Sequence, residues 1–249
     1  MEEVTAQYDH VHMKKLGNST LGIPIHYLII TKADLATSPK IYINGTHHGN
    51  EKASTEAALG VIDYLSRKHK DIAISNMLHK FVFIVQPLVN PDGHSQNSRL
   101  ASGGIDPNRD YPSPFGKGPY FQLKETQLVA ELMERYQFYA SAAIHSGMEA
   151  ILWPWGSSAK KSAHENLFLN VGRLIADAMA IRSYQRSYLD YRTEGEFIDY
   201  AYMQYGTFAF TIEVSREASP DKKQLPFVVQ KSVKGILAFA SGLNKAHSH

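Results

Sequence analysis

The loop over residues 45–51 holds the side chains of this sequence that are best suited to bind a metal ion. His48 and Glu51 stand three residues apart, as His-x-x-Glu. A bend at Gly49 and Asn50 would turn the imidazole and the carboxylate toward one point, because both residue types tolerate tight-turn backbone angles. Two histidines and one glutamate, with water in the fourth position, form a catalytic zinc site. The pattern therefore predicts a Zn²⁺ site that needs a second histidine.

His145 is the candidate for that second histidine. It ends a predicted strand over 140–145 and is followed by Ser146 and Gly147, and strand ends are where α/β proteins place functional groups. A lone histidine at such a place is more often structural, but His48 and Glu51 together favour the ligand interpretation.

The other histidines are weaker candidates. His47 would point away from His48 in an extended segment, so we expect it to lie behind the ligands or on the surface. The remaining ones lie in polar or terminal stretches and are expected to be solvated: His10, His12, His69, His79, His247 and His249.

Alternating strands and helices are expected to position these side chains. Apolar β-branched runs predict strands, and apolar residues at helical spacing predict helices. The order predicts an α/β fold in which a mixed central β-sheet is sandwiched between helices, in a single catalytic domain over 1–249. Residues 94–120 form a loop too long for a plain connection, which predicts a functional or a disordered segment. The predicted strands are 25–31, 41–44, 81–85, 140–145 and 208–214, and the predicted helices are 55–68, 124–136, 166–180 and 228–243.

Composition excludes several classes of function. The chain has 249 residues, 43% of them hydrophobic, which suffices for a large core. Its net charge of +2 comes from scattered residues and predicts no nucleic-acid partner. Cysteine is absent, so thiolate metal sites and cysteine nucleophiles are excluded. No apolar run reaches membrane-spanning length, so no membrane partner is expected. The N-terminus has no apolar signal-peptide core, which predicts a cytoplasmic protein unless a leader has been removed; the oligomeric state is open.

Two motif-like segments fail on inspection. His164-Glu165 begins like a zinc-binding helix, but Phe168 stands where the second histidine is required. The segment from Asp106 begins like a calcium loop, but Tyr111 replaces the necessary glycine.

Five short motifs occur in order along the chain. They are His48-x-x-Glu51, the Asn-Pro-Asp-Gly turn at 90–93, the Asp-x-Asn-Arg segment at 106–109, Ile144-His145-Ser146 with an aromatic-Pro-aromatic-Gly strand at 153–156, and the strand over 208–213 ending on Glu213. In these motifs the chain resembles the zinc metallocarboxypeptidases of the carboxypeptidase A type. It departs from the pancreatic enzymes at Asn50, where they have arginine, and it is shorter than they are.

The resemblance implies the catalytic roles. His48, Glu51 and His145 would bind one Zn²⁺ per chain. Glu213 would be the general base that takes a proton from the attacking water and passes it to the leaving amine. Arg99 would stabilise the developing oxyanion; the alternative is that it is a solvated loop residue.

The resemblance also implies how a substrate would bind. Asn108 and Arg109 would grip a free carboxylate, although their segment could instead be a structural turn. Tyr191, 22 residues before Glu213, matches a mobile tyrosine that covers the substrate, but surface tyrosines are common here. Ile198 would set the side-chain preference toward apolar or aromatic C-terminal residues. Three acids nearby could reverse that preference: Asp190, Glu196 and Asp199.

Three functions remain open from the sequence. The first is a zinc carboxypeptidase that hydrolyses the C-terminal peptide bond of peptides. The second is a related zinc amidohydrolase acting on murein peptides or N-acyl amino acids, which would share every catalytic residue. The third is a non-catalytic zinc-binding or peptide-binding module. Glu213 counts against the third, because an unpaired carboxylate in an apolar strand is costly and a binder has no need of a base.

Overall fold

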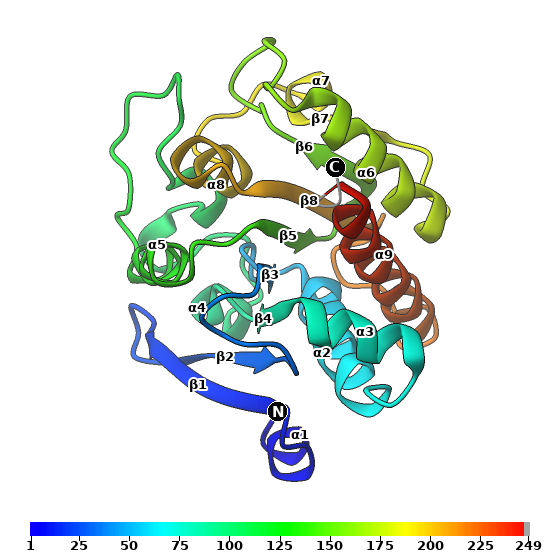
Figure 1. The fold of residues 1–249 in the computed structure, drawn as a ribbon. Coiled ribbons are helices and arrows are strands. Elements are labelled where there is room, and N and C mark those ends of the chain that lie inside the picture. The colour runs from blue at the N-terminus through cyan, green and yellow to red at the C-terminus, as the bar shows by residue number, and fades with distance from the viewer. Residues whose placement is uncertain (247–249) are drawn as a thin grey trace.

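An eight-stranded mixed sheet runs through the computed structural model, which describes residues 1–246 (Figure 1). The strand order is β1-β2-β4-β3-β5-β8-β6-β7. The bounds are β1 Val11–Asn18, β2 Pro24–Ile30, β3 Lys40–Gly45, β4 Val82–Gln86, β5 Ala140–His145, β6 Met148–Trp153, β7 Tyr184–Arg186 and β8 Phe208–Ser215.

The centre of the sheet is parallel. β3 pairs in parallel with β4 and with β5, and β5 pairs in parallel with β8. β2 and β6 run antiparallel to the outer members of this group, β4 and β8. Parallel strands covered on both faces are apolar without alternation, as in the fully buried β4. This arrangement brings the carboxyl ends of β3, β5 and β8 to one edge of the sheet.

Helices cover both faces of the sheet, and their bounds are α1 Glu2–Gln7, α2 Lys52–Arg67, α3 Ile72–Lys80, α4 Pro91–Ser95, α5 Lys124–Tyr136, α6 Glu165–Met179, α7 Ser187–Asp190, α8 Phe197–Tyr205 and α9 Leu225–Ala246. Residues of α2, α3, α6 and α9 pack into one buried cluster, and residues of α5 and α8 pack into a second one. Figure 1 shows these two groups on opposite sides of the sheet. The predicted α/β fold, with its mixed sheet between helices, is confirmed.

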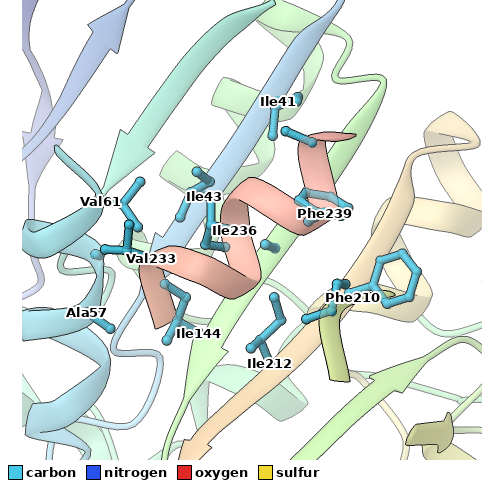
Figure 2. Close-up of a cluster of buried hydrophobic side chains, with 14 of the residues drawn as sticks. Ile41, Ile43, Ala57, Val61, Ile144, Phe210, Ile212, Val233, Ile236 and Phe239 are labelled. Atoms are coloured by element: carbon cyan, nitrogen blue, oxygen red, sulfur yellow. The ribbon is translucent and has the colours of Figure 1, made fainter. Parts of the chain in front are cut away.

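Each central strand feeds both clusters by alternation. Ile41 and Ile43 of β3 belong to the first cluster, whereas Tyr42 between them belongs to the second. Figure 2 shows part of the first cluster, in which Ile236 and Phe239 of α9 lie over the sheet. Each such buried side chain stabilises the fold by about 1.5–3 kcal/mol relative to its exposed state. The sheet edge that carries the ligands is therefore held from both sides.

Several elements escaped the sequence patterns. The unpredicted elements are β1, the three-residue β7, α1, α3, α4, α7 and α8. The strand expected over 153–156 lies earlier, because β6 ends at Trp153. α8 is rich in aromatic residues, which are typical of strands, and β1 is an edge strand whose polar residues hide the alternation. Residues 94–120 form an ordered loop with short 3-10 helices at Ser102–Gly104 and Pro107–Arg109.

The expectation for two histidines was wrong. His10 and His69 lie half-buried against each other, with ring centroids 4.5 Å apart, and Tyr8 contacts both rings. Burial, with the neighbouring His69 and Lys32, lowers the pKa of His10 to about 4. His247 and His249 lie outside the described residues.

Within residues 1–246, none of the helices combines the length and the apolar character needed to cross a bilayer. The assignment of 1–249 to one catalytic domain stays a prediction.

Candidate active site

The loop over residues 45–51, called the metal-binding loop below, leaves β3 through an unusual backbone conformation at Thr46, whose φ is 62°. The sequence placed the bend at Gly49 and Asn50, but neither residue has a positive φ. Gly49 serves a different purpose: a Cβ atom there would lie 2.0 Å from the carbonyl carbon of Gly93. Glycine is therefore needed for the close approach of the loop to the following turn.

The Asn-Pro-Asp-Gly turn holds the metal-binding loop in place. The side-chain amide of Asn90 donates to the carbonyl of His47 at 3.1 Å, and its oxygen accepts from the N–H of Gly93 at 2.8 Å. The backbone N–H of Asn90 also donates to the carbonyl of Thr46. The turn at 90–93 thus fixes the backbone of the loop that carries His48 and Glu51.

Three donor atoms converge where β3 and β5 end. His48 Nδ1 lies 2.7 Å from one carboxylate oxygen of Glu51, and His145 Nδ1 lies 3.0 Å from the other. One ligand atom from each of the three residues lies within 4.8 Å of the others, and all three residues are buried. Such a set of two imidazoles and one carboxylate fits Zn²⁺.

Asp106 orients the first of these ligands. Its carboxylate lies 3.0 Å from His48 Nε2, the ring nitrogen that faces away from Glu51. An outer carboxylate of this kind fixes the tautomer and the ring direction of a metal-binding histidine. The sequence pattern named only Asn108 and Arg109 from this segment, so Asp106 was missed.

The electrostatics favour an anionic Glu51. Burial acts to raise the pKa of its carboxyl, but the adjacent imidazoles of His145 and His48 outweigh that effect and hold the pKa below its ordinary value. A carboxylate must be deprotonated to bind a metal ion. The ligand is therefore ready before any metal arrives.

Glu213 lies beside the three ligands. In the parallel pairing of β5 and β8 it stands directly opposite His145. Its Oε2 atom is buried and has no hydrogen-bond partner among the described residues. Burial and the nearby Glu51 raise the pKa of its carboxyl well above the ordinary value. A carboxylate whose basicity is raised in this way suits the task of a general base.

A cavity opens over these groups. Arg99 lies at its edge and pairs with Asp106 at 3.1 Å and with Glu51 at 3.7 Å. The cavity is lined by His48, Glu51, Arg99, Asn108, Arg109, His145, Met148, Leu152, Ser187, Asp190, Tyr191, Glu196, Thr211 and Glu213. Eight of the nine residues singled out from the sequence therefore meet in one place.

Asn108 and Arg109 present donors to this cavity. The side-chain oxygen of Asn108 accepts from the N–H of Phe197 at 3.0 Å, so its amide nitrogen is the group that can meet an anion. One guanidinium nitrogen of Arg109 donates to the hydroxyl of Tyr191 at 3.0 Å. Tyr191 is 56% exposed. Its ring is held chiefly by this arginine, at 5.9 Å from ring centroid to guanidinium carbon.

Ile198 departs from the expectation. It is 1% exposed and packs in the second buried cluster, and it is not among the residues that line the cavity. Two of the acids near it, Asp190 and Glu196, line the cavity instead. The third, Asp199, accepts hydrogen bonds from the N–H groups of Gly156 and Ser157 and so holds the backbone after β6.

His47 lies behind the ligands, one of the two places expected for it. Its ring stacks on His145 with centroids 5.5 Å apart, and its Nε2 lies 3.0 Å from the hydroxyl of Tyr111. Burial, followed by the neighbouring His145, lowers the pKa of His47 well below its ordinary value. A neutral His47 adds no positive charge behind the metal site.

Known proteins are similar to this chain in sequence and in fold. The family model described as zinc carboxypeptidase matches residues 1–235. Carboxypeptidase SOL1 of Arabidopsis thaliana is 23% identical over 254 residues, which cover 94% of this chain and 52% of that protein. The chain thus spans about half the length of that relative.

Two solved structures share the fold. The structure of thrombin activatable fibrinolysis inhibitor superposes with a TM-score of 0.87 at 22% identity, covering 96% of this chain and 71% of that one. Carboxypeptidase A from Helicoverpa armigera superposes with a TM-score of 0.86 at 21% identity, covering 100% of this chain and 72% of that one. Since the family model spans nearly the whole chain, the protein belongs to the zinc carboxypeptidase family, a family of zinc metallopeptidases.

Proposed function

We propose that this protein is a zinc-dependent carboxypeptidase that releases the C-terminal residue of a peptide with a free carboxylate. The observation that carries the proposal is a single cavity lined by a three-residue zinc ligand set, an unpaired carboxylate and an arginine beside an amide donor. The ligand set alone would equally serve a binding module. Glu213 and Arg109 together favour hydrolysis of a substrate that ends in an anion.

Each residue of the cavity has a defined task. His48, Glu51 and His145 would hold Zn²⁺, which when bound polarises the substrate carbonyl and lowers the pKa of water. Glu213 accepts the proton of the attacking water on a carboxylate oxygen and donates it to the leaving amine nitrogen. Arg99 places a fixed positive charge where the carbonyl oxygen becomes negative.

The substrate is positioned at its C-terminal end. Arg109 and the amide nitrogen of Asn108 bind the terminal carboxylate, since a guanidinium fork can meet both of its oxygens. Tyr191 then leaves its contact with Arg109, or shares it, and covers the bound residue. Recognition of the terminal carboxylate restricts cleavage to the last peptide bond.

Product identification tests this proposal against the related amidohydrolase. Zinc-loaded protein is incubated with linear peptides, N-acyl amino acids and murein peptides, and the products are identified by mass spectrometry. We expect stepwise loss of single residues from the C-termini of linear peptides. Cleavage of acyl amino acids or murein peptides alone would establish the amidohydrolase instead, and cleavage of none of them would contradict both.

A further inference from the structure

Two acidic side chains, Glu196 and Asp190, line the same cavity as the catalytic groups. Thr211 stands two residues before Glu213 on the same face of β8, so the floor continues about 7 Å inward along that strand. Leu152 of β6 pairs with Thr211 and completes the floor. The buried Glu196 and the exposed Asp190 line this cavity as well. A residue held by Arg109 would extend its side chain into this space.

The fold builds a specific position for the Glu196 carboxylate. Gly156 makes room for it, because a Cβ atom at that position would lie 2.3 Å from Glu196 Oε2. The hydroxyl of Ser187 donates to the same oxygen at 3.0 Å. Asp199 in turn fixes the backbone of Gly156. The Glu196 carboxylate is therefore held in a defined position in the cavity, unlike a mobile acid on the surface.

Within the described part of the chain, one cation lies close to Glu196, and it is incompletely matched. Arg109 Nη1 is 4.0 Å from Glu196 Oε1, at the limit of an ion pair. The same nitrogen donates to the carbonyl of Asn108 at 2.6 Å, and the other one donates to Tyr191. When a substrate carboxylate binds Arg109, it neutralises part of the positive charge that otherwise faces Glu196. A buried carboxylate left without that charge either takes up a proton or pairs with another cation.

We propose that Glu196, assisted by Asp190, recognises a cationic side chain on the leaving residue, so that the preferred C-terminal residue is lysine or a related amine-bearing amino acid. This inference rests on the proposed carboxypeptidase function. It replaces the apolar preference expected from Ile198, which packs in the core. A residue with both a carboxylate and a cationic side chain matches Arg109 and Glu196 at the same time.

Two substrates that share the same four side-chain carbons test the inference. N-benzoylglycyl-lysine and N-benzoylglycyl-norleucine differ chiefly in the charged amine. We expect kcat/KM to favour lysine by at least about 10-fold, the consequence of leaving a buried charge unpaired with norleucine. Glu196→Gln should remove most of that ratio. Glu194→Gln makes the same change two positions earlier on an exposed side chain outside the cavity, and should preserve the ratio.

Two results would overturn the inference. One is cleavage of norleucine as fast as lysine by the wild-type protein. The other is a Glu196→Gln variant that loses activity on both substrates equally, since Glu196 would then only support Arg109. If Glu196→Gln does not fold, Asp190→Asn provides the second test: a reduced lysine ratio in it would support recognition of the cation by the acidic pair, and an unchanged ratio would overturn that recognition as proposed.

Binding separates this inference from the proposed function. Absence of C-terminal release from every peptide would contradict the carboxypeptidase activity itself. Calorimetry with zinc-loaded Glu213→Gln protein then still compares the lysine and norleucine ligands. Tighter binding of lysine would support the acidic pocket, and equal or absent binding would refute it.

Discussion

We expect turnover to depend most directly on the side chain of Glu213. Glu213→Gln keeps the size of the side chain but cannot accept a proton, so we expect kcat to fall by at least about 10²-fold. Zinc content should stay at one ion per chain, because Glu213 is not part of the ligand set. Steady-state kinetics with metal analysis of the same sample measures both. A variant with near wild-type kcat would remove Glu213 from the role of base.

The protonation of Glu196 predicts a pH dependence of side-chain preference. Burial, followed by the neighbouring Asp199, raises the pKa of its carboxyl to about 7, against a lowering effect of Arg109. The carboxyl is neutral below that pKa and charged above it, whereas a lysine amine stays charged until about pH 10. The lysine-to-norleucine ratio of kcat/KM should therefore rise as the pH increases through about 7.

The norleucine substrate is the internal control for that pH series. Any titration that affects catalysis in general changes both substrates and cancels in the ratio. The Glu196→Gln variant should show a flat ratio over the same range. A flat ratio in the wild-type protein would show that Glu196 does not titrate in the enzyme as the structure indicates.

At the scale of elements, the metal site depends on the contact between two loops. A methyl group at Gly49 would lie 2.0 Å from Gly93 and 2.2 Å from the backbone nitrogen of His94. Gly49→Ala must therefore displace the loop that carries His48 and Glu51. We expect zinc affinity to fall by about 10-fold or more and the free energy of unfolding to fall by about 1–3 kcal/mol.

Chelator competition and denaturant unfolding measure these two effects. Asn50→Ala, one position along the same loop, is the matched control, because it shortens a side chain instead of adding one against backbone. It should keep most of the zinc affinity. Wild-type zinc affinity in Gly49→Ala would mean that the loop tolerates the shift and that the contact does not set the site.

Sequence patterns predicted the elements that carry the ligands because those elements are strongly patterned. β3, β4, β5 and β8 are buried on both faces and appear as short apolar runs. His48 and Glu51 follow such a run and His145 ends one, so their convergence was predictable. Glu213 lies inside β8, and the resemblance to the zinc metallocarboxypeptidases placed it beside them. The presence of Glu196 in the cavity was not predictable, because Glu196 and Ile198 are two residues apart and only the packing at the start of α8 decides which one faces the cavity.

The backbone conformation of the metal-binding loop could not be predicted from the sequence either. Glycine at position 49 is compatible with a bend or with a close contact, and the composition of the loop alone cannot separate the two. The contact partner, Gly93, lies 44 positions along the chain and is brought near by the parallel pairing of β3 and β4. Asp106 was missed for the same reason: its role depends on where His48 Nε2 points.

At the scale of the whole molecule, we expect the fold not to depend on the metal. Two buried clusters hold the sheet from both sides, and neither includes the zinc ligands. We therefore expect removal of zinc by a chelator to abolish activity while the protein keeps its circular dichroism spectrum and a cooperative thermal transition. The midpoint temperature of the transition should fall, because the metal-free protein loses the stabilisation that zinc binding gives to the folded state. An unfolded metal-free protein at room temperature would contradict this view.

The cavity is proposed to bind a free C-terminal carboxylate next to a zinc-dependent hydrolytic site. The most direct test of this proposal compares kcat/KM for one peptide as the free acid and as the C-terminal amide, in the wild-type protein and in Arg109→Ala. We expect the acid to be cleaved at least about 10²-fold faster, and Arg109→Ala to weaken its use by roughly 2–5 kcal/mol with little effect on the amide. Equal rates on acid and amide in both proteins would contradict the account.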